Sequence, residues 1–415
     1  MRAARRFDIR PMRFCMITTF YPPYSFGGDA VYVHSLSNLL AKRGNQVDVI
    51  HCLDSYRALG GTQPAAETVS EPSITVHRLS SPFGWLSPLA TQQTGHPLFK
   101  SAEIERVLST NDFDVIHFHN ISLVGGPALL HFGKALKLYT IHEHWLVCPM
   151  HTLFRNNREP CHEKRCIQCA LHYHRPPQLW RYTNLLREAV GQVDAFLAPT
   201  EFTRSLHMAS GLPMRIITVP GFHDIVPDQD LTPEVYGTPL QRPFFLYAGR
   251  LEKLKGVHTL IPAFRSYSSA DLVIAGDGNE AASLREAARD CPNIIFLGHV
   301  LRAHLSNLYS RATAVLVPSL GTEVFPLVML EAFAARTPVI ARDHGPLPEI
   351  VRESGGGLLY RNESDLPGLL QWMQDHPQER NRMAESGYRA WQSKWTPDVH
   401  LERYFSVIAD LASSK

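Results

Sequence analysis

Long apolar runs and an excess of charge of one sign are both missing from this 415-residue sequence. No stretch of about 18 uninterrupted apolar residues occurs, so no membrane-spanning helix is expected. The 41 Lys and Arg residues against 39 Asp and Glu residues give a formal charge of +2, and we expect no nucleic-acid partner. The 44% apolar content excludes disorder, collagen and coiled coil.

Cysteine is scarce and odd in number, with seven residues in the chain. Four of them lie within 22 residues, which favours reduced thiols over a disulfide framework. The first apolar run, Phe14 to Phe20, contains two threonines and has no small-residue cleavage site after it, so it is interpreted as a strand rather than a signal peptide. We expect a cytoplasmic protein, with peripheral contact at the inner face of the membrane left open.

Short β-rich apolar runs alternate with helical segments in both halves of the chain, as in parallel sheets built from strand, helix, strand units. The first half contains seven runs, at 14–20, 47–52, 74–79, 115–119, 138–142, 195–199 and 216–220. The second half contains six, at 244–249, 272–276, 294–298, 314–318, 339–341 and 357–360. The pattern predicts an α/β protein with two Rossmann-like, doubly wound parallel-sheet domains facing a cleft.

A Pro- and Asp-rich segment without apolar periodicity, 223–242, is predicted to connect the two domains. We assign residues 1–225 to a first domain, with a cysteine-rich loop at 148–175, and residues 243–390 to a second domain. Residues 391–415 carry aromatic and aliphatic residues at helical spacing, and this C-terminal helix is expected to pack back on the first domain.

Paired glycines, Gly27 and Gly28, follow the first predicted strand, where they would let the backbone approach a ligand closely. Asp29 is expected to cap the next helix, whose free N–H groups can bind an anion or a sugar hydroxyl. A tight turn between strand and helix explains this motif about equally well.

Two cations and a helix start mark strand ends in the second half. Arg250 and Lys255 follow the run at 244–249 and can neutralise charge on a departing diphosphate. Pro326 fits the first helical position, so Leu327 and Val328 would point free amides at a ligand, and Glu331 could bind both hydroxyls of a ribose. Solvated cations and surface glutamates are the alternative for each motif taken alone.

These motifs together resemble glycosyltransferase family 4, whose members are retaining enzymes with the GT-B fold. Two glutamates separated by seven residues, Glu323 and Glu331, follow Pro-Ser and precede an Ala-rich helix and Thr-Pro-Val-Ile-Ala. The likeness extends over most of the chain through Phe20-Tyr21-Pro22-Pro23 with Gly27-Gly28, Gly249-Arg250 with Lys255-Gly256, Gly276-Asp277-Gly278, Leu297-Gly298-His299-Val300, and Leu347-Pro348-Glu349-Ile350-Val351.

The resemblance implies that the domain at 1–225 binds the acceptor and the domain at 243–390 binds a nucleoside diphosphate sugar. It also implies roles for individual residues toward that donor. Glu323 would hold the transferred sugar, Val300 would pack on the base, and His142 would lie beside the anomeric centre on the acceptor side. The implied catalytic residues are His142, Glu323, Arg250 and Lys255, and the implied donor site consists of Gly27, Gly28, Arg250, Lys255, Val300, Glu323, Phe325, Leu327, Val328 and Glu331. Pro326 replaces a glycine common in the family and removes one N–H donor.

The implied activity is transfer of a sugar, with retention at the anomeric carbon, to a hydroxyl of a glycan, lipid-linked or small-molecule acceptor in surface polysaccharide or glycoconjugate synthesis. Asp-x-Asp occurs only before a strand, at 112–114, and in the connection, at 228–230, so catalysis is expected to need no divalent metal. A GT-B nucleotide-sugar epimerase and a non-catalytic metal-binding scaffold are the alternatives. A nicotinamide dehydrogenase is disfavoured because Gly276-Asp277-Gly278 lacks the third glycine.

A cysteine array begins six residues after His142, with the spacing C-x12-C-x4-C-x2-C at Cys148, Cys161, Cys166 and Cys169. Four thiolates can close a structural zinc site, and C-x4-C-x2-C also matches the spacing of plant-type iron–sulfur proteins. Disulfides or free buried thiols are the alternatives. A bound metal would order a loop over the acceptor side of the cleft. The segment 175–187 that follows mixes Arg with aromatic and aliphatic residues, as expected of either an anionic membrane contact or a packed interdomain helix.

Overall fold

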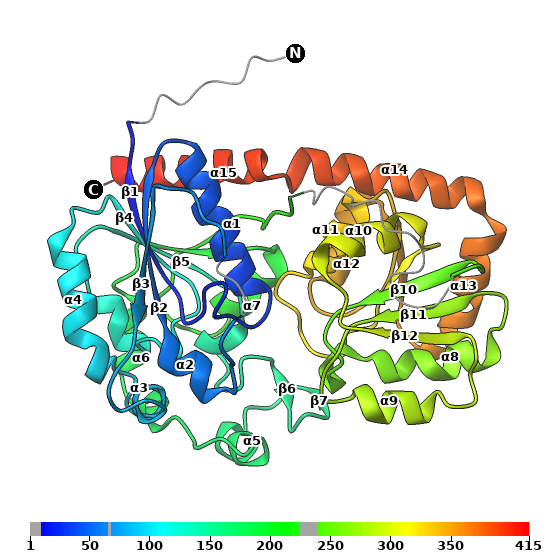
Figure 1. The fold of residues 1–415 in the computed structure, drawn as a ribbon, viewed down its shortest axis with the longest axis horizontal. Coiled ribbons are helices and arrows are strands. Elements are labelled where there is room, and N and C mark those ends of the chain that lie inside the picture. The colour runs from blue at the N-terminus through cyan, green and yellow to red at the C-terminus, as the bar shows by residue number, and fades with distance from the viewer. Residues whose placement is uncertain (1–9, 65–67, 225–239, 415) are drawn as a thin grey trace.

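Two parallel sheets lie side by side in the computed structural model, which describes residues 10–64, 68–224 and 240–414 (Figure 1). The first sheet has the strand order β3-β2-β1-β4-β5-β8-β9. Its strands are β1 (Arg13–Ile17), β2 (Gln46–Cys52), β3 (Ile74–Leu79), β4 (Val115–Phe118), β5 (Leu136–Thr140), β8 (Ala195–Ala198) and β9 (Ile216–Thr218). Each of the seven apolar runs predicted in the first half contributes one of these strands.

The second sheet has the order β12-β11-β10-β13-β14-β15, and its pairings are all parallel. Its strands are β10 (Phe244–Ala248), β11 (Asp271–Ala275), β12 (Ile294–Gly298), β13 (Val315–Val317), β14 (Val339–Arg342) and β15 (Gly357–Tyr360). In both sheets the strand order reverses direction beside the first strand of the domain, and ligand sites of doubly wound folds lie at that point. The predicted doubly wound α/β fold is confirmed.

Because both faces of each sheet are buried, the strands are continuous apolar runs and do not alternate apolar with polar residues. In β1, Cys15 and Ile17 enter one core cluster while Phe14 and Met16 enter the cluster on the opposite face. Helices cover both faces of the sheets, so neither face requires polar residues.

Helices of the first domain are α1 (Gly28–Lys42), α2 (Leu53–Ala58), α3 (Leu86–Thr94), α4 (Ser101–Thr110), α5 (Cys166–His172), α6 (Leu185–Val190) and α7 (Glu201–Met208). Those that follow are α8 (Leu260–Ser266), α9 (Ala281–Ala287), α10 (Arg302–Arg311), α11 (Leu327–Ala334), α12 (Leu347–Ser354), α13 (Leu366–Asp375), α14 (Pro377–Lys394) and α15 (Pro397–Ser413). Among the described residues, none of these helices has the length and apolar character needed to cross a bilayer.

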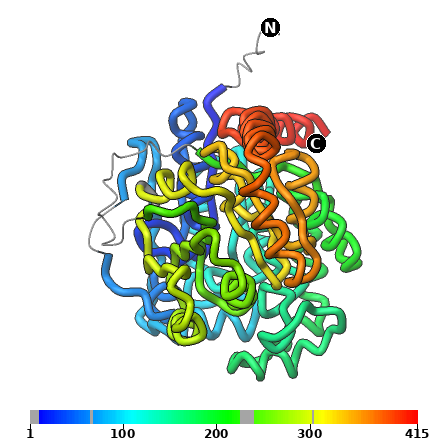
Figure 2. Tube along the Cα trace, turned by 90° about the vertical axis from the view of Figure 1, so that its right-hand side faces the viewer, coloured from blue at the N-terminus to red at the C-terminus, as the bar shows by residue number. Residues whose placement is uncertain are grey.

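The last two helices run back across the molecule from the second sheet to the first (Figure 1). Seen from the side of the second sheet, α13 and α14 (orange) lie along one edge, and the chain ends beyond them at α15 (red, Figure 2). Leu401, Tyr404 and Ile408 of α15 pack in the same core cluster as Phe14 and Leu138 of the first sheet. The segment predicted to connect the domains lies mostly at 225–239, outside the described residues.

The cysteine-rich segment forms a small lobe of its own at the lower edge of Figure 1. It contains an antiparallel two-stranded hairpin, β6 (Phe154–Arg155) and β7 (Glu159–Pro160), followed by α5. Asn156 and Asn157 turn the hairpin with φ of 50° and 51°, a backbone conformation that asparagine tolerates better than most residues.

Candidate active site

A single cleft of 1710 Å³ is lined by residues that follow strands of both sheets. The volume exceeds the roughly 300–1,000 Å³ of an ordinary small-molecule site, so two ligands can lie in it together. From the first domain it includes Gly27, Gly28 and His142, and from the second Arg250, Lys255, Glu323, Phe325, Leu327, Val328 and Glu331. Nine of the ten predicted donor residues, together with His142, therefore border one space.

The wall of the cleft formed by the second domain is built around an ion pair between Lys255 and Glu323. Lys255 Nζ lies 2.7 Å from Glu323 Oε1, and Ser319 Oγ donates to the same oxygen at 2.7 Å. Burial alone would raise the pKa of Glu323, but Lys255, Ser319 and Arg250 lower it below its usual range. Glu323 is therefore an ionised carboxylate that keeps Lys255 at the cleft.

Gly256 allows the Lys255 turn to approach the end of β13. Its φ is +73°, and a Cβ there would stand 2.1 Å from the carbonyl oxygen of Pro318. Side chains rarely adopt this backbone conformation, and the backbone oxygen leaves no room for one. The Lys-Gly sequence thus has a direct steric reason, because glycine lets the lysine reach Glu323.

Helix α11 points its first turn at the cleft. Pro326 is the N-cap residue, with φ −79° and ψ 91°, so the helix starts at Leu327, one position later than predicted from the preference of proline for the first helical position. The amides of Leu327 and Val328 are still free to bind a ligand, because they are the first two of the helix and have no intrahelical acceptor. An anionic ligand there would meet free N–H groups and the positive end of the helix dipole.

Glu331 lies one turn into α11 and faces the same cleft. Its Oε2 accepts a hydrogen bond from Tyr309 at 2.6 Å, and its Oε1 lies 3.9 Å from His223 Nδ1. The hydrogen bond from Tyr309 fixes Oε2 and thereby orients the whole carboxylate. The carboxylate can still accept hydrogen bonds from the two hydroxyls of a diol.

The wall of the cleft formed by the first domain contains a chain of aromatic polar side chains behind His142. His142 Nε2 shares a 2.9 Å hydrogen bond with His119 Nδ1, and the His142 ring lies 4.8 Å from the ring of Tyr32. Burial, with a contribution from His400, lowers the pKa of His142 to about 3. At neutral pH His142 is therefore an uncharged hydrogen-bonding group held in place by His119.

Asp29 and Glu143 put two carboxylates beside His142. Asp29 accepts a 3.1 Å hydrogen bond from Asn120 and does not cap α1, because Gly27, with φ +85°, occupies the N-cap position. Burial and the nearby Glu143 raise the pKa of Asp29 to about 6. Glu143 Oε2 lies 2.7 Å from His151 Nδ1, which brings the start of the cysteine-rich segment to the cleft.

Three contacts join the first domain to the second around the loop that carries Glu323. His144 Nε2 lies 3.2 Å from the carbonyl oxygen of Thr322, and Thr203 Oγ1 donates to the carbonyl of Val324 at 3.3 Å. The carboxylate of Glu349 accepts the backbone N–H groups of residues 201 and 202 at 2.7 and 2.8 Å, so a carboxylate of the second domain binds the start of α7. These contacts hold the wall that carries His142 against the loop that carries Glu323.

Comparisons with known proteins agree with this geometry. The family model for Glycosyltransferase Family 4 matches residues 26–226, and that for Glycosyl transferases group 1 matches residues 228–390. The chain belongs to glycosyltransferase family 4. It is a GT-B glycosyltransferase, and the predicted family and enzyme class are confirmed.

Several glycosyltransferases are similar to this chain over nearly its whole length. Glycogen synthase of Mycobacterium tuberculosis is 28% identical over 96% of this chain and 94% of its own. Sucrose-phosphate synthase from Thermosynechococcus elongatus has a TM-score of 0.76 at 19% identity, covering 97% of this chain and 100% of that one. Anabaena Alr3699/HepE, solved in complex with UDP and glucose, has a TM-score of 0.70 at 17% identity, covering 96% and 100%.

Val300 is the one predicted donor residue that the structure places away from the cleft of the glycosyltransferase. It is 7% exposed and packs in the core cluster of the second sheet, while its neighbour His299 lines the cleft. Of the two Asp-x-Asp sequences, Asp114 accepts the backbone N–H of Arg13 at the other end of the first sheet, and residues 228–230 lie outside the described residues. That catalysis needs no divalent metal stays a prediction.

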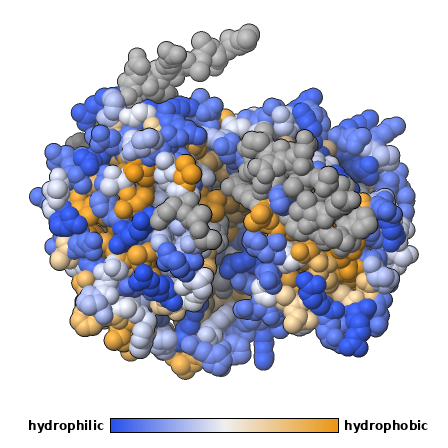
Figure 3. All heavy atoms as spheres, in the orientation of Figure 1, coloured by the Kyte–Doolittle hydropathy of each residue, from blue (hydrophilic) through white to orange (hydrophobic). Residues whose placement is uncertain are grey.

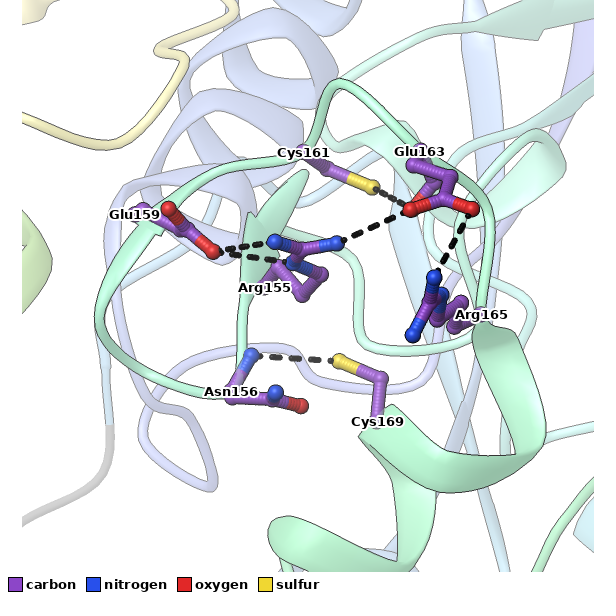
Figure 4. Close-up of polar contacts among 7 residues, drawn as sticks. All are labelled: Arg155, Asn156, Glu159, Cys161, Glu163, Arg165 and Cys169. Atoms are coloured by element: carbon purple, nitrogen blue, oxygen red, sulfur yellow. Dashed lines mark hydrogen bonds and ion pairs between the residues drawn. The ribbon is translucent and has the colours of Figure 1, made fainter.

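The predicted metal site at Cys148, Cys161, Cys166 and Cys169 is not supported. All seven cysteines are free thiols, and among the described residues no three His, Cys, Asp or Glu side chains are arranged to hold a metal ion. The sulfurs make separate contacts instead (Figure 4): Cys161 donates to the carbonyl of Glu163 at 3.5 Å, and Cys169 accepts the N–H of Asn156 at 3.4 Å. Burial, with a contribution from neighbouring cysteines, raises the pKa of Cys161 and Cys166.

Ion pairs and the hairpin hold the cysteine lobe together (Figure 4). Arg155 pairs across the hairpin with Glu159 and reaches Glu163 at 3.5 Å, and Arg165 pairs with Glu163 at 3.2 Å. Residues of this lobe, including His151 and Tyr173, line the cleft. Its predicted position beside the cleft thus agrees with the structure even though the predicted metal does not.

Sequence reasoning missed most of the residues that support His142. His119, Tyr32 and Glu143 carry no motif of their own, although the alternation His117-Phe118-His119-Asn120 at the end of β4 was a usable signal. Polar side chains are uncommon at the end of a buried parallel strand unless a site or a partner requires them.

Asp29→Asn is expected to stabilise the glycosyltransferase at pH 7 to 8 by roughly 1–2 kcal/mol. The pKa of Asp29 is raised from 3.8 to about 6 on folding, so the ionised form opposes folding above pH 6 and the penalty fades as pH falls toward 4. Two pKa units would give ~3 kcal/mol in full, but Asp29 keeps partial solvent contact. Denaturant unfolding from pH 4 to 8 should show the gain growing with pH, with the exposed Asp112→Asn as control. An equal gain at pH 4 and pH 8 would contradict this assignment.

Proposed function

We propose that this glycosyltransferase moves a sugar from a nucleoside diphosphate sugar to an acceptor hydroxyl with retention at the anomeric carbon, in the synthesis of a surface polysaccharide or glycoconjugate. One observation carries the proposal: the Lys255–Glu323 pair stands at the amino end of α11, in the same cleft as His142. The UDP-bound and UDP-glucose-bound states of the similar Anabaena protein support a nucleotide-sugar donor.

The donor side of the cleft matches the charge that develops on a leaving diphosphate. Lys255, Arg250 and the first amides of α11 would surround its oxygens, while Glu331 binds the ribose. Preorganised donors of this kind stabilise developing charge without having to reorient during the reaction. The fit between a carboxylate, two cations and a helix start is what favours a nucleoside diphosphate over a neutral sugar.

Retention requires the acceptor oxygen to attack from the face that the diphosphate leaves. In that step the bond from the anomeric carbon to the diphosphate oxygen breaks, the bond to the acceptor oxygen forms, and the acceptor proton passes to the departing phosphate. Glu323 is engaged by Lys255 and Ser319, an arrangement that suits positioning of the transferred sugar. Neutral His142 can then orient the acceptor or the sugar by hydrogen bonding.

Thermal unfolding with UDP, GDP, ADP and TDP and their sugars tests the donor assignment. At about 100 times the dissociation constant, a ligand that binds only the folded state adds ~2.7 kcal/mol of stability. We expect one nucleotide series to stabilise the wild type and to lose that effect in Glu331→Ala. Glu286→Ala, an exposed glutamate paired with Arg289, serves as control.

Two results would contradict the proposal. Stabilisation that persists in Glu331→Ala would remove the carboxylate from the ribose site. Donor turnover that yields only an epimerised or hydrolysed sugar with every acceptor class tried would favour the epimerase alternative instead.

A further inference from the structure

The first domain exposes a concentrated apolar surface next to the cleft. Fifteen large apolar residues are exposed among the described residues, and ten of them fall between positions 83 and 182, so the exposure is not scattered. One part is formed by α3 and the turns on either side of it: Phe83, Trp85, Leu86, Leu89, Leu98 and Phe99. The other part is Ile167 and Leu171 of α5 with Leu179 and Tyr182 beyond it.

The two parts are joined by contacts that hold α3 against the segment after α5. Trp180 Nε1 donates to the carbonyl of Gln92 at 2.9 Å, and the Gln92 side chain donates to the carbonyl of Pro176 at 3.1 Å. The rings of Phe83 and Phe99 stack with centroids 4.3 Å apart, although each of the two residues remains about half exposed. Apolar residues gather along the lower-left edge of the space-filling view, where α3 and α5 lie in Figure 1 (Figure 3).

The size and composition of this surface set it apart from ordinary exposed residues. Trp85, Leu179 and Tyr182 are each more than 60% exposed. Large exposed apolar patches mark interaction sites, and Trp and Tyr are the residues that favour the interface between lipid and water.

The segments that form the two parts of this surface carry more positive than negative charge. The sequence from 155 to 188 holds seven Lys and Arg residues and three Glu, and no Asp or Glu occurs from 81 to 102. Two of the three glutamates are already paired, Glu159 with Arg155 and Glu163 with Arg155 and Arg165. Exposed Arg158, Lys164 and Arg175 are left facing solvent.

The surface is continuous with the cleft. Trp85 and Leu89 of α3 line it, as do Arg175 and Pro176 on the other part. The polar end of a molecule anchored in the partner that covers the apolar surface can therefore extend directly toward His142.

We propose that this apolar surface with its rim of cations docks on an anionic lipid bilayer, so that the cleft opens toward a lipid-linked acceptor held in that bilayer. Docking itself is independent of catalysis, whereas the role of the bound lipid as acceptor rests on the proposed function. The sequence predicted a membrane contact only from 175–187, where Trp180 is in fact buried and Arg181 stacks on it at 4.6 Å. The exposed residues of α3 and its flanking turns are the larger part of the surface.

Co-sedimentation of the full chain with phosphatidylcholine vesicles, with and without phosphatidylglycerol, tests the docking. The wild type is expected to bind the anionic vesicles at least about tenfold more tightly than the neutral ones, since each cation near the membrane strengthens binding severalfold. The Phe83→Ser/Phe99→Ser double variant should lose about tenfold in partitioning, because neither residue lines the cleft and both would enter the interface. Met208→Ser, equally exposed on α7, is the matched control and should partition as the wild type.

Stabilisation by nucleotide, measured on the same variants, separates this proposal from the proposed function. Nucleotide stabilisation that survives in the double variant, together with lost vesicle binding, supports docking through this surface. Wild-type protein that stays in solution with anionic vesicles, or a double variant that binds them as the wild type does, overturns it. A wild-type protein that is dimeric in sedimentation velocity, with a monomeric double variant, also overturns it, because a second copy of this chain would then cover the apolar surface.

Discussion

Replacing Lys255 with methionine is expected to lower kcat/KM for sugar transfer by about 10²–10³-fold, the range found when one donor to a developing oxyanion is removed. Lys255 is held at the cleft by Glu323 at 2.7 Å, in a turn that Gly256 brings against β13. Methionine keeps the length and apolar stem of the side chain and removes only the charge. The loss should therefore fall on stabilisation of the leaving diphosphate.

The same variant has a signature that a general loss of folding would not produce. Without Lys255, burial is no longer opposed by its main cation and the pKa of Glu323 rises. The acidic limb of the kcat/KM profile against pH should move to higher pH, since a larger fraction of Glu323 is protonated at a given pH. Lys134→Met, which removes an exposed lysine that does not line the cleft, should leave both the rate and the profile unchanged. A kcat/KM of Lys255→Met within threefold of the wild-type value would exclude a role for Lys255 in stabilising the leaving diphosphate.

Glu349→Ala is expected to lower kcat by about 10–100-fold while leaving nucleotide stabilisation intact. Its carboxylate accepts two backbone N–H groups at the start of α7, and charge-assisted bonds to a helix start are among the stronger polar contacts. Removing it loosens the contact between the domains, and a displacement of about 1 Å between reacting groups can cost 10²-fold in rate. Arg250, Lys255 and Glu331, the residues assigned to the nucleotide, all belong to the second domain, so the nucleotide should keep its affinity.

A variant on the same helix provides the comparison for Glu349. Glu353 lies one turn later and pairs with Lys394 at the end of α14 at 3.2 Å, so Glu353→Ala removes a carboxylate without touching α7. We expect it to keep the wild-type kcat. Glu349→Gln, which retains one acceptor oxygen, should fall between the two. Equal rates in Glu349→Ala and Glu353→Ala would show that the interdomain contact has no part in catalysis.

The donor side of the site was predictable because its residues are close together in the sequence. Leu327, Val328 and Glu331 lie within one helical turn or so of each other, and helical geometry alone places them together. Pro326 was misplaced by one position because proline is compatible with both the N-cap and the first helical position, and only the backbone angles separate the two. Lys255 and Glu323 were both predicted, but their direct ion pair depends on how β10 and β13 pair.

The acceptor side depended on contacts between distant segments. His119 and His142 are 23 positions apart, Asp29 and Asn120 are 91 apart, and Tyr404 of α15 reaches His117 across 287 positions. Strand order decides such meetings, and many orders are compatible with the same apolar runs. The cysteine array is the converse case: spacing suggested one shared centre, whereas in the structure the sulfurs of Cys161 and Cys169 contact different backbone groups.

The sequence by itself determined the thirteen strands of the two large sheets, the family and the grouping of Leu327, Val328 and Glu331 on one helix start. It could do so because buried parallel strands are continuous apolar runs and the donor motif is local. Only the tertiary structure decided that His119 holds His142, that Glu349 joins the domains, and that the exposed residues of α3 and α5 form one surface beside the cleft. These features arise from packing between segments far apart in the chain, where side-chain contacts are set by topology rather than by any local pattern.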